Sequence, residues 1–366
     1  LCFGLVRENL PQDKVPLGIG IVAGTMSTAA GVGFVVGGLA IDYLTWHWIF
    51  YISTIAAVIG LVLVMWLLPP SPRKPQGEHL DILGGVMFAP AVAGLLFALT
   101  KAPAWGWADT RTLGLGGGSL VLLVCWGLYE WRHPTPLIDV RLFRNRQIAL
   151  TNLCYVLISV GAMQFAQVLF TLLQQPAWTG VGLGVAATMA AMIKLPSSLV
   201  AIVASPWAGY ISGRHGARRA MLYAMFFLIG GWAALTIHHS TIWFVVLAVM
   251  ANGIGTAIAF SAIPNLIVEV APAQRISEIT GLTQVIRTTF MAVGAQMVAF
   301  VFGAHTITSS EHPGTFPNEQ AYTTVFGIIT LLCVACLLVC LALPRRGSPG
   351  YALQTDEKPS GEVHVR

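Results

Sequence analysis

Charged residues are scarce in this sequence: Asp, Glu, Lys and Arg together make up only 10% of its 366 residues, whereas hydrophobic residues make up 56%. A water-soluble domain with so little charge would expose large apolar patches and aggregate. The mean hydropathy is +0.74, so the chain is predicted to be a polytopic membrane protein. No segment alternates with the period of a barrel strand, which predicts an all-α fold.

The sequence also lacks the motifs of several enzyme and pump mechanisms. It contains no GxxxxGK phosphate-binding loop, HExxH zinc pair, GxSxG nucleophile or pair of intramembrane aspartates. These absences argue against an ATP-driven pump and an intramembrane enzyme, and no nucleotide or cofactor is expected. The acids Asp42, Glu130 and Glu269 lie at the margins of apolar segments. A proton-coupled transporter needs a group that is alternately exposed and buried, and no carboxylate here suits that role.

Ten apolar segments are long enough to cross a bilayer as helices. They are expected at residues 17–41, 46–68, 82–103, 112–130, 148–173, 184–212, 219–237, 241–266, 279–304 and 321–343.

Basic residues lie almost entirely on one side of these segments. Sixteen of the 20 Lys and Arg residues fall in one set of loops and the tail, whereas the opposite set holds only Lys101 and Arg111. Because cytoplasmic loops carry the excess of basic residues, the first set is expected to be cytoplasmic, together with a disordered tail at 344–366. The net charge of +5 then reflects topology, so the expected surroundings are lipid and no nucleic-acid partner is expected.

The six cysteines lie in or beside apolar segments. They are Cys2, Cys125, Cys154, Cys333, Cys336 and Cys340. The last three share a helix face, but no His or carboxylate accompanies them as a typical metal site would require. We therefore expect buried thiols that pack as small apolar residues, and no metal.

The first segment carries a stripe of small residues. The stripe consists of Gly20, Gly24, Ser27, Gly31 and Gly38, and Gly33 and Gly37 form a second patch on an adjacent face. Small residues let helix backbones approach closely in lipid. By periodicity alone, the stripe predicts helix packing.

The residues of this segment also resemble a known motif. Gly20, Gly33, Gly37 and Gly38, followed by Asp42 and the run at 46–50, resemble the antiporter motif on the fifth helix of major facilitator transporters. Ala29 replaces a usual glycine, and Phe34 stands where the motif has proline. The bend that proline would introduce is therefore not expected.

Two further regions resemble the 14-helix drug:proton antiporter branch of that superfamily. Residues 81–146 are similar to its central helix pair and the following loop, with Asp81, Gly84 and Glu130 among the matching positions. Residues 196–219 are similar to the second helix of its C-terminal bundle and a basic cytoplasmic turn. The matching residues of the turn are Gly209, Gly213, Arg214, Gly216, Arg218 and Arg219. The strongest form of this turn has an acid where Gly213 stands, so no charge lock is expected there.

The resemblance implies a major facilitator fold that contains family helices five to fourteen and lacks the first four. Residues 1–16 would be the end of an earlier helix and a loop, 17–68 the last two helices of the N-terminal bundle, 69–147 the central pair, and 148–343 the C-terminal six-helix bundle.

The implied function is proton-coupled efflux of drugs or other amphipathic or cationic small molecules across the plasma membrane, by alternating access. Without the first four helices, the chain alone is not expected to transport. The alternatives are an exporter of one endogenous metabolite or lipid, and a non-transporting truncated membrane protein.

Two cations within segments are candidates for a central cavity, because a Lys or Arg there costs about 2.5–3.5 kcal/mol unless it faces a cavity or partner. Arg287 shares a helix face with Thr280, Thr283 and Gln284, and snorkelling to the headgroups is the alternative. Lys194 lies two residues before Pro196, and it too would either face a cavity or snorkel to the headgroups.

Uncharged polar residues within segments complete the set of cavity candidates. Gln164 and Gln167, three residues apart, would line a cavity or make interhelical hydrogen bonds. Asn252 is a further candidate.

Overall fold

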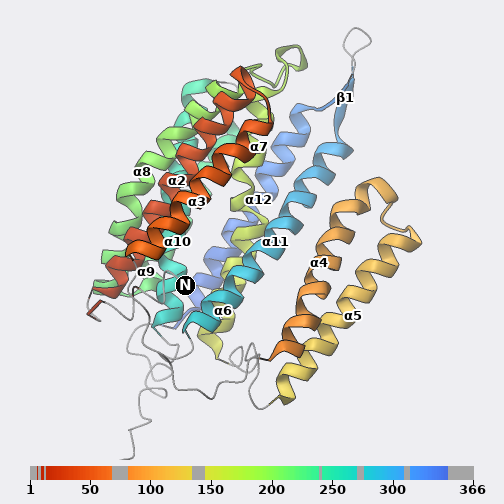
Figure 1. Ribbon diagram of the computed structural model, residues 1–366. Coiled ribbons are helices and arrows are strands. Elements are labelled where there is room, and N and C mark those ends of the chain that lie inside the picture. Colours follow the sequence, from red (N-terminus) through yellow and green to blue (C-terminus); the bar gives the residue numbers. More distant parts are fainter. Residues whose placement is uncertain are drawn as a thin grey trace, which may run out of the picture.

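The computed structural model describes residues 14–67, 81–133, 145–238, 241–269, 276–308 and 314–344, together with Val6, Leu10 and Pro11 (Figure 1). Ten helical crossings in these residues are long and apolar enough to span a membrane, and each coincides with a predicted segment. The predicted all-α membrane fold is therefore confirmed. The predicted loops at 69–80 and 134–144, and the tail after Pro344, lie outside the described residues.

The crossings are built from eleven α-helices, because one crossing is divided into α6 and α7. The helices are α2 (Val15–Tyr43), α3 (His47–Leu67), α4 (Ile82–Trp105), α5 (Thr110–Arg132), α6 (Arg146–Val160), α7 (Phe165–Gln174), α8 (Ala187–His215), α9 (Ala217–Ile237), α10 (Ile242–Val268), α11 (Ile276–Ala304) and α12 (Glu319–Ala342). Two 3-10 turns, Ala162–Gln164 and Ala177–Thr179, flank α7.

A short hairpin that the sequence analysis missed joins α11 to α12. Its strands β1 (Thr306–Thr308) and β2 (Thr315–Pro317) pair antiparallel. Gln175 ties the hairpin to the bundle, since its Nε2 donates to the carbonyl of Pro317 at 2.8 Å and its Oε1 accepts from the Tyr322 hydroxyl at 2.6 Å.

The buried core lies among helices α6 to α12, where Trp232, Tyr155 and Phe326 are among the largest fully buried side chains. Helix α2 packs along α8 and also contacts α10. Helix α3 has no buried residue among those described. Its exposed apolar surface is suited to lipid or to further protein. Whether 17–68 belongs to a separate N-terminal bundle stays a prediction.

Helices α4 and α5 form a pair that stands beside α11 at the edge of the molecule (Figure 1). Asp81 is the N-cap residue directly before α4. Its carboxylate accepts from the backbone N–H of Gly84 at 2.8 Å and so caps the helix. The hydroxyl of Tyr129 on α5 donates to the same carboxylate at 3.2 Å. This acid therefore ties the two helices together. Glu130 lies two residues before the end of α5, at a segment margin as predicted, and its side chain is fully buried.

Candidate functional site

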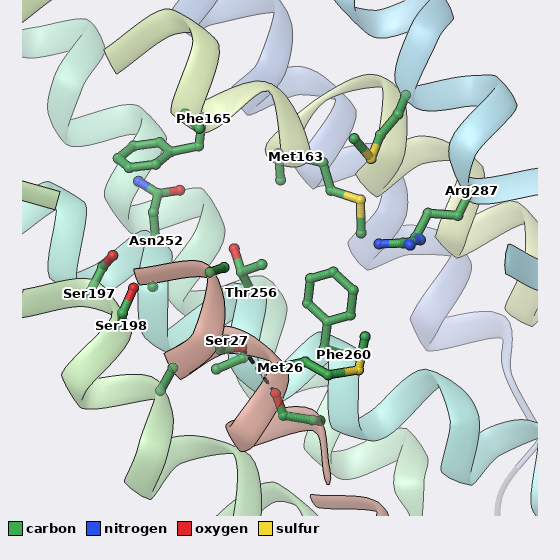
Figure 2. A pocket seen from close by; sticks show the side chains of 18 of the residues that line it. Met26, Ser27, Met163, Phe165, Ser197, Ser198, Asn252, Thr256, Phe260 and Arg287 are labelled. Atoms are coloured by element: carbon green, nitrogen blue, oxygen red, sulfur yellow. Dashed lines mark hydrogen bonds between the residues drawn. The ribbon is translucent and has the colours of Figure 1, made fainter. Parts of the chain in front are cut away.

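A cavity of about 410 Å³ opens between α2, α6, α7, α8, α10 and α11 (Figure 2). Its walls are mostly apolar and aromatic, with a few polar groups, which is typical of small-molecule sites. The apolar lining includes Met26, Phe34, Met163, Phe165, Phe260 and Met291. The polar lining includes Ser27, Ser197, Ser198, Asn252, Thr256 and Gln284, with the cations Lys194 and Arg287.

Lys194 lies on α8 near one end of the cavity. Its Nζ donates to the hydroxyl of Ser197 at 2.8 Å, and that hydroxyl donates in turn to the carbonyl of Lys194 at 2.7 Å. The ammonium also lies 5.3 Å from the ring centroid of Phe165, within the range of a cation–π contact. The i to i+3 spacing of Lys194 and Ser197 on one helix produces this local pairing.

Arg287 lies on α11 and faces the same cavity. Its guanidinium carbon is 5.5 Å from the ring centroid of Phe260, and Figure 2 shows the side chain directed toward Phe260 and Met163. Gln284, one turn earlier on α11, also lines the cavity. Both intramembrane cations are thus among the lining residues of this cavity, and a role for either in substrate binding stays a prediction.

Gln164 and Gln167, for which cavity lining and hydrogen bonding were the two alternatives, are not among the residues that line this cavity. The crossing breaks at Gly161, and Gln164 lies in the 3-10 turn that follows. Its Nε2 donates to the carbonyl of Ser159 at 2.7 Å and to the carbonyl of Met291 on α11 at 3.0 Å. This is the interhelical hydrogen bonding that the sequence analysis gave as the alternative. The side chain of Gln167 is exposed.

Asn252 lines the cavity from α10, and a role in substrate binding stays a prediction. Its Nδ2 donates to the carbonyl of Ala248 at 3.0 Å, whereas its buried Oδ1 has no hydrogen-bond partner among the described residues. The sequence analysis missed Phe34 as a lining residue. The ring that replaces the proline of the antiporter motif lines this cavity and lies 5.2 Å, centroid to centroid, from the ring of Phe170.

The small stripe of α2 packs against α8. A Cβ atom built at Gly20 would lie 2.6 Å from the carbonyl oxygen of Ser205, and one at Gly38 would lie 3.0 Å from that of Ala187. A Cβ at Gly31 would collide with the Ser198 side chain. Gly33 and Gly37 behave differently, because a Cβ at either one meets no heavy atom within 4 Å. Of the two small patches, only the stripe makes a close helix contact.

Asp42 at the end of α2 caps the start of α8. Its Oδ2 accepts from the backbone N–H of Thr188 at 2.7 Å, and its Oδ1 accepts from that of Ala187 at 3.3 Å. The residue at the N-cap of α8, Ala186, provides no side-chain cap. A carboxylate at a helix N-terminus is favoured by the orphan N–H groups and the helix dipole. The acid therefore holds the two helix ends together.

Replacing Asp42 with Ala is expected to weaken this end of the α2–α8 contact, because two backbone N–H groups lose their acceptor. Spin labels at the exposed residues Tyr43 and Met189 report the separation of the helix ends, and the variant should show a larger population at long distances. Asp109 provides the matched control, since it caps only its own helix α5 through the N–H of Arg111. An unchanged distance distribution in Asp42→Ala would contradict the capping role.

The arginines of the predicted basic turn lie where α8 ends and α9 begins, and each has a different hydrogen-bonding environment. Gly216 has a φ of 88°, which favours glycine at this helix end. Arg218 donates from Nε to the carbonyl of Cys340 at 3.1 Å and from Nη2 to that of Leu341 at 2.8 Å, which caps the end of α12. Arg214 donates to the Tyr210 hydroxyl at 2.8 Å, and Arg219 is exposed.

Two glycines of the same region, Gly209 and Gly213, lie against the start of α2. A Cβ at Gly209 would collide with the carbonyl oxygen of Pro16, and one at Gly213 would lie 3.6 Å from the Pro16 side chain. The turn has no acid at Gly213, but a carboxylate from another helix contacts it. Glu269, the residue directly after α10, accepts through Oε1 from the N–H of Ala217 at 3.0 Å. The sequence analysis missed this contact because Glu269 is distant in the chain.

The sequence predicted a shared face of Cys333, Cys336 and Cys340 on α12. In the structure the cluster consists of Cys336, Cys340 and Cys154. Cys154 on α6 lies with its Sγ 3.6 Å from that of Cys340, and Cys336 joins them, with the three sulfurs within 4.8 Å of one another. All three side chains are fully buried between α6 and α12. The absence of a metal stays a prediction, as does the packing role of these thiols.

Comparison with known proteins identifies a family. The chain matches the Major Facilitator Superfamily over residues 1–295 and again over residues 158–363. It is 27% identical over 329 residues to the tetracenomycin C resistance and export protein of Streptomyces glaucescens, covering 87% of this chain and 57% of the relative.

Two further relatives are named for resistance. The multidrug resistance protein Stp of Mycobacterium tuberculosis is 25% identical over 306 residues, covering 82% of this chain and 55% of the relative. The lincomycin resistance protein LmrB of Listeria monocytogenes is 29% identical over 253 residues, covering 65% and 51%. The chain thus spans little more than half the length of these relatives. Its ten apolar crossings and the match over nearly its whole length lead to one conclusion: the chain belongs to the Major Facilitator Superfamily, as a multi-pass membrane protein.

Proposed function

We propose that the protein is a secondary active exporter of amphipathic small molecules, driven by proton entry and working by alternating access. The observation that carries the proposal is the cavity between α2 and the core helices, lined by aromatic and methionine side chains with a few polar groups. Such a lining suits the binding of amphipathic molecules of varied shape. The names of the relatives, which include resistance and export proteins, support efflux as the direction of transport.

Alternating access would change the contact between α2 and the core helices. Transporters of this kind bind substrate near the middle of the membrane and rock one bundle against another. The α2–α8 contact ends in a cap made by a single acid, Asp42, so its end is suited to open and close at modest cost. The loops that carry most of the Lys and Arg residues would face the cytoplasm of a plasma membrane.

The described lining of the cavity contains no Asp or Glu. We therefore place the proton-carrying group outside this lining, in another part of the protein. The coupling would then act through conformation rather than through a carboxylate that contacts the substrate.

The test uses the protein expressed from its complete gene in inverted membrane vesicles. With an energised membrane, the vesicles should accumulate tetracenomycin C or lincomycin, the compounds in the names of two relatives, and a protonophore should abolish the accumulation. Vesicles without the protein provide the background. Accumulation that persists unchanged with the protonophore would overturn proton coupling, and no accumulation of either compound or of a wider set of amphipathic drugs would overturn drug export.

A further inference from the structure

The charges on the cavity wall all have one sign. Lys194 and Arg287 line the cavity, and none of the described lining residues is an Asp or a Glu. Uncompensated charge inside a membrane protein is costly, and an intramembrane cation commonly marks a partner or a substrate path. An unbalanced pair of cations in one cavity therefore calls for a negatively charged occupant.

Of the two cations, Arg287 has the fewer hydrogen bonds in the described residues. Its Nε is buried and has no hydrogen-bond partner in the described residues. Its guanidinium carbon lies 5.5 Å from the ring centroid of Phe260. A planar guanidinium that lies over an aromatic ring, with an Nε–H that has no partner in the described residues, matches a carboxylate or another planar oxyanion.

In the part of the chain that the structure describes, Lys194 hydrogen-bonds the Ser197 hydroxyl and lies over the Phe165 ring, and both partners are neutral. The ammonium has three N–H donors, and the hydrogen bond to Ser197 uses one. A second cationic contact for an acidic group is therefore available on α8.

The aromatic partners of the two cations lie at different positions along the cavity. Figure 2 shows Phe165, the partner of Lys194, close to Asn252, whereas Phe260, the partner of Arg287, lies farther along α10. Asn252 and Phe260 are eight residues apart on this helix, which corresponds to about 12 Å along its axis. The wall between them is apolar apart from small hydroxyls such as Thr256.

We propose that this cavity selects organic anions: molecules with an aromatic or polycyclic body and a carboxylate or phenolate group, anchored by Arg287 and, at the other end of the cavity, contacted by Lys194. The inference rests on the proposed function, because it names the substrate class of the same cavity. It also reverses the expectation of cationic substrates, since a cationic drug would meet two like charges and no acid on this wall.

The experiment measures equilibrium binding to the protein expressed from its complete gene and placed in nanodiscs. The probes are three fluorescent anthracenes of similar size: anthracene-9-carboxylic acid, its neutral amide, and the cationic 9-aminomethylanthracene. The acid should bind about tenfold or more tightly than the amide, and the amine most weakly, because charge-assisted hydrogen bonds distinguish the three. A wild-type protein that binds the amine as tightly as the acid would overturn the proposal.

Variants separate a ligand contact from a structural role. Arg287→Gln should weaken binding of the acid about tenfold or more and change binding of the amide by less than about twofold. Lys194→Gln should have the same selectivity with a smaller effect, because its ammonium is already hydrogen-bonded. Arg287→Lys retains the charge and should retain the preference for the acid. Lys101→Gln, at an exposed position on α4 away from the lining, is the control. An equal loss for all three probes in Arg287→Gln would assign Arg287 to helix packing or an ion pair with another segment, and would overturn the inference.

The inference and the proposed function fail differently. Binding in nanodiscs needs no proton gradient, so a preserved preference for the acid without protonophore-sensitive export would refute the coupling and leave the anion site intact. Protonophore-sensitive export by a protein that binds the amine as well as the acid would refute the anion site alone.

Discussion

Replacing Gly20 with Ala is expected to lower the free energy of unfolding by about 1–3 kcal/mol, the usual cost of overpacking. The new Cβ would lie 2.6 Å from the carbonyl oxygen of Ser205 and 3.0 Å from the Cα of Pro206. Both atoms belong to the backbone of α8 and cannot rotate away. The α2–α8 contact must therefore widen along its length, and dispersion contacts across the stripe are lost.

Gly37 on the same helix provides the matched control. Among the described residues, a Cβ there meets no heavy atom within 4 Å, so Gly37→Ala is expected to add the better helix propensity of Ala, a gain of about 0.5–1 kcal/mol. The two substitutions are chemically identical and are expected to change stability in opposite directions.

Thermal unfolding in detergent, followed by loss of the monodisperse protein peak, provides the measurement. Gly20→Ala should lower the midpoint by roughly 2–8 °C and reduce export in vesicles. Equal midpoints for the two variants would mean that α2 does not pack on α8 through its stripe. Reduced export by Gly37→Ala alone would point to a role for the other face of α2.

Replacing Gln164 with Leu is expected to destabilise the protein by about 1–3 kcal/mol, because one buried carbonyl and one partly buried carbonyl each lose a hydrogen-bond donor. Those carbonyls belong to Ser159 at the broken end of α6 and to Met291 on α11. Lipid offers no substitute donor. The break in this crossing is therefore expected to depend on a single amide side chain.

Gln167→Leu is the control within the same crossing. The side chain of Gln167 is exposed, and an exposed Leu in a bilayer is at least as favourable as Gln. Unfolding midpoints of the two variants and of Gln164→Glu, which keeps the shape and removes the amide donor, test the assignment. Equal loss of stability in Gln164→Leu and Gln167→Leu would show that the hydrogen bonds of Gln164 do not support the break.

Some features of the fold and site follow from the sequence because they are local. A crossing needs about 20 apolar residues in succession, and this requirement acts on each segment separately, so the ten predicted spans agree with the ten helical crossings. The two cations were also identifiable, because a Lys or Arg within such a segment is rare and costly. Four of the six predicted cavity residues, Lys194, Arg287, Gln284 and Asn252, line the cavity.

Other features depended on which helix faces meet, and apolar composition does not determine that. In lipid, a face that touches a neighbouring helix is as apolar as a face that touches acyl chains. Periodicity therefore could not distinguish the stripe of Gly20 and Gly38, which contacts α8, from Gly33 and Gly37, which have no close neighbour. The same reason explains why Gln164 and Gln167 were considered together, although the structure separates them.

The sequence by itself determined that this chain is a helical membrane protein, how often it crosses, and which cations lie within the crossings, because hydropathy and charge act residue by residue against the bilayer. Only the tertiary structure decided that Lys194 and Arg287 share one cavity with Phe34, that Glu269 reaches the basic turn, and that Cys154 joins Cys336 and Cys340. Each of these groupings joins residues from different helices. Such contacts arise from backbone approach and crossing geometry, which depend on side-chain fit between helices rather than on the order of residues within one helix.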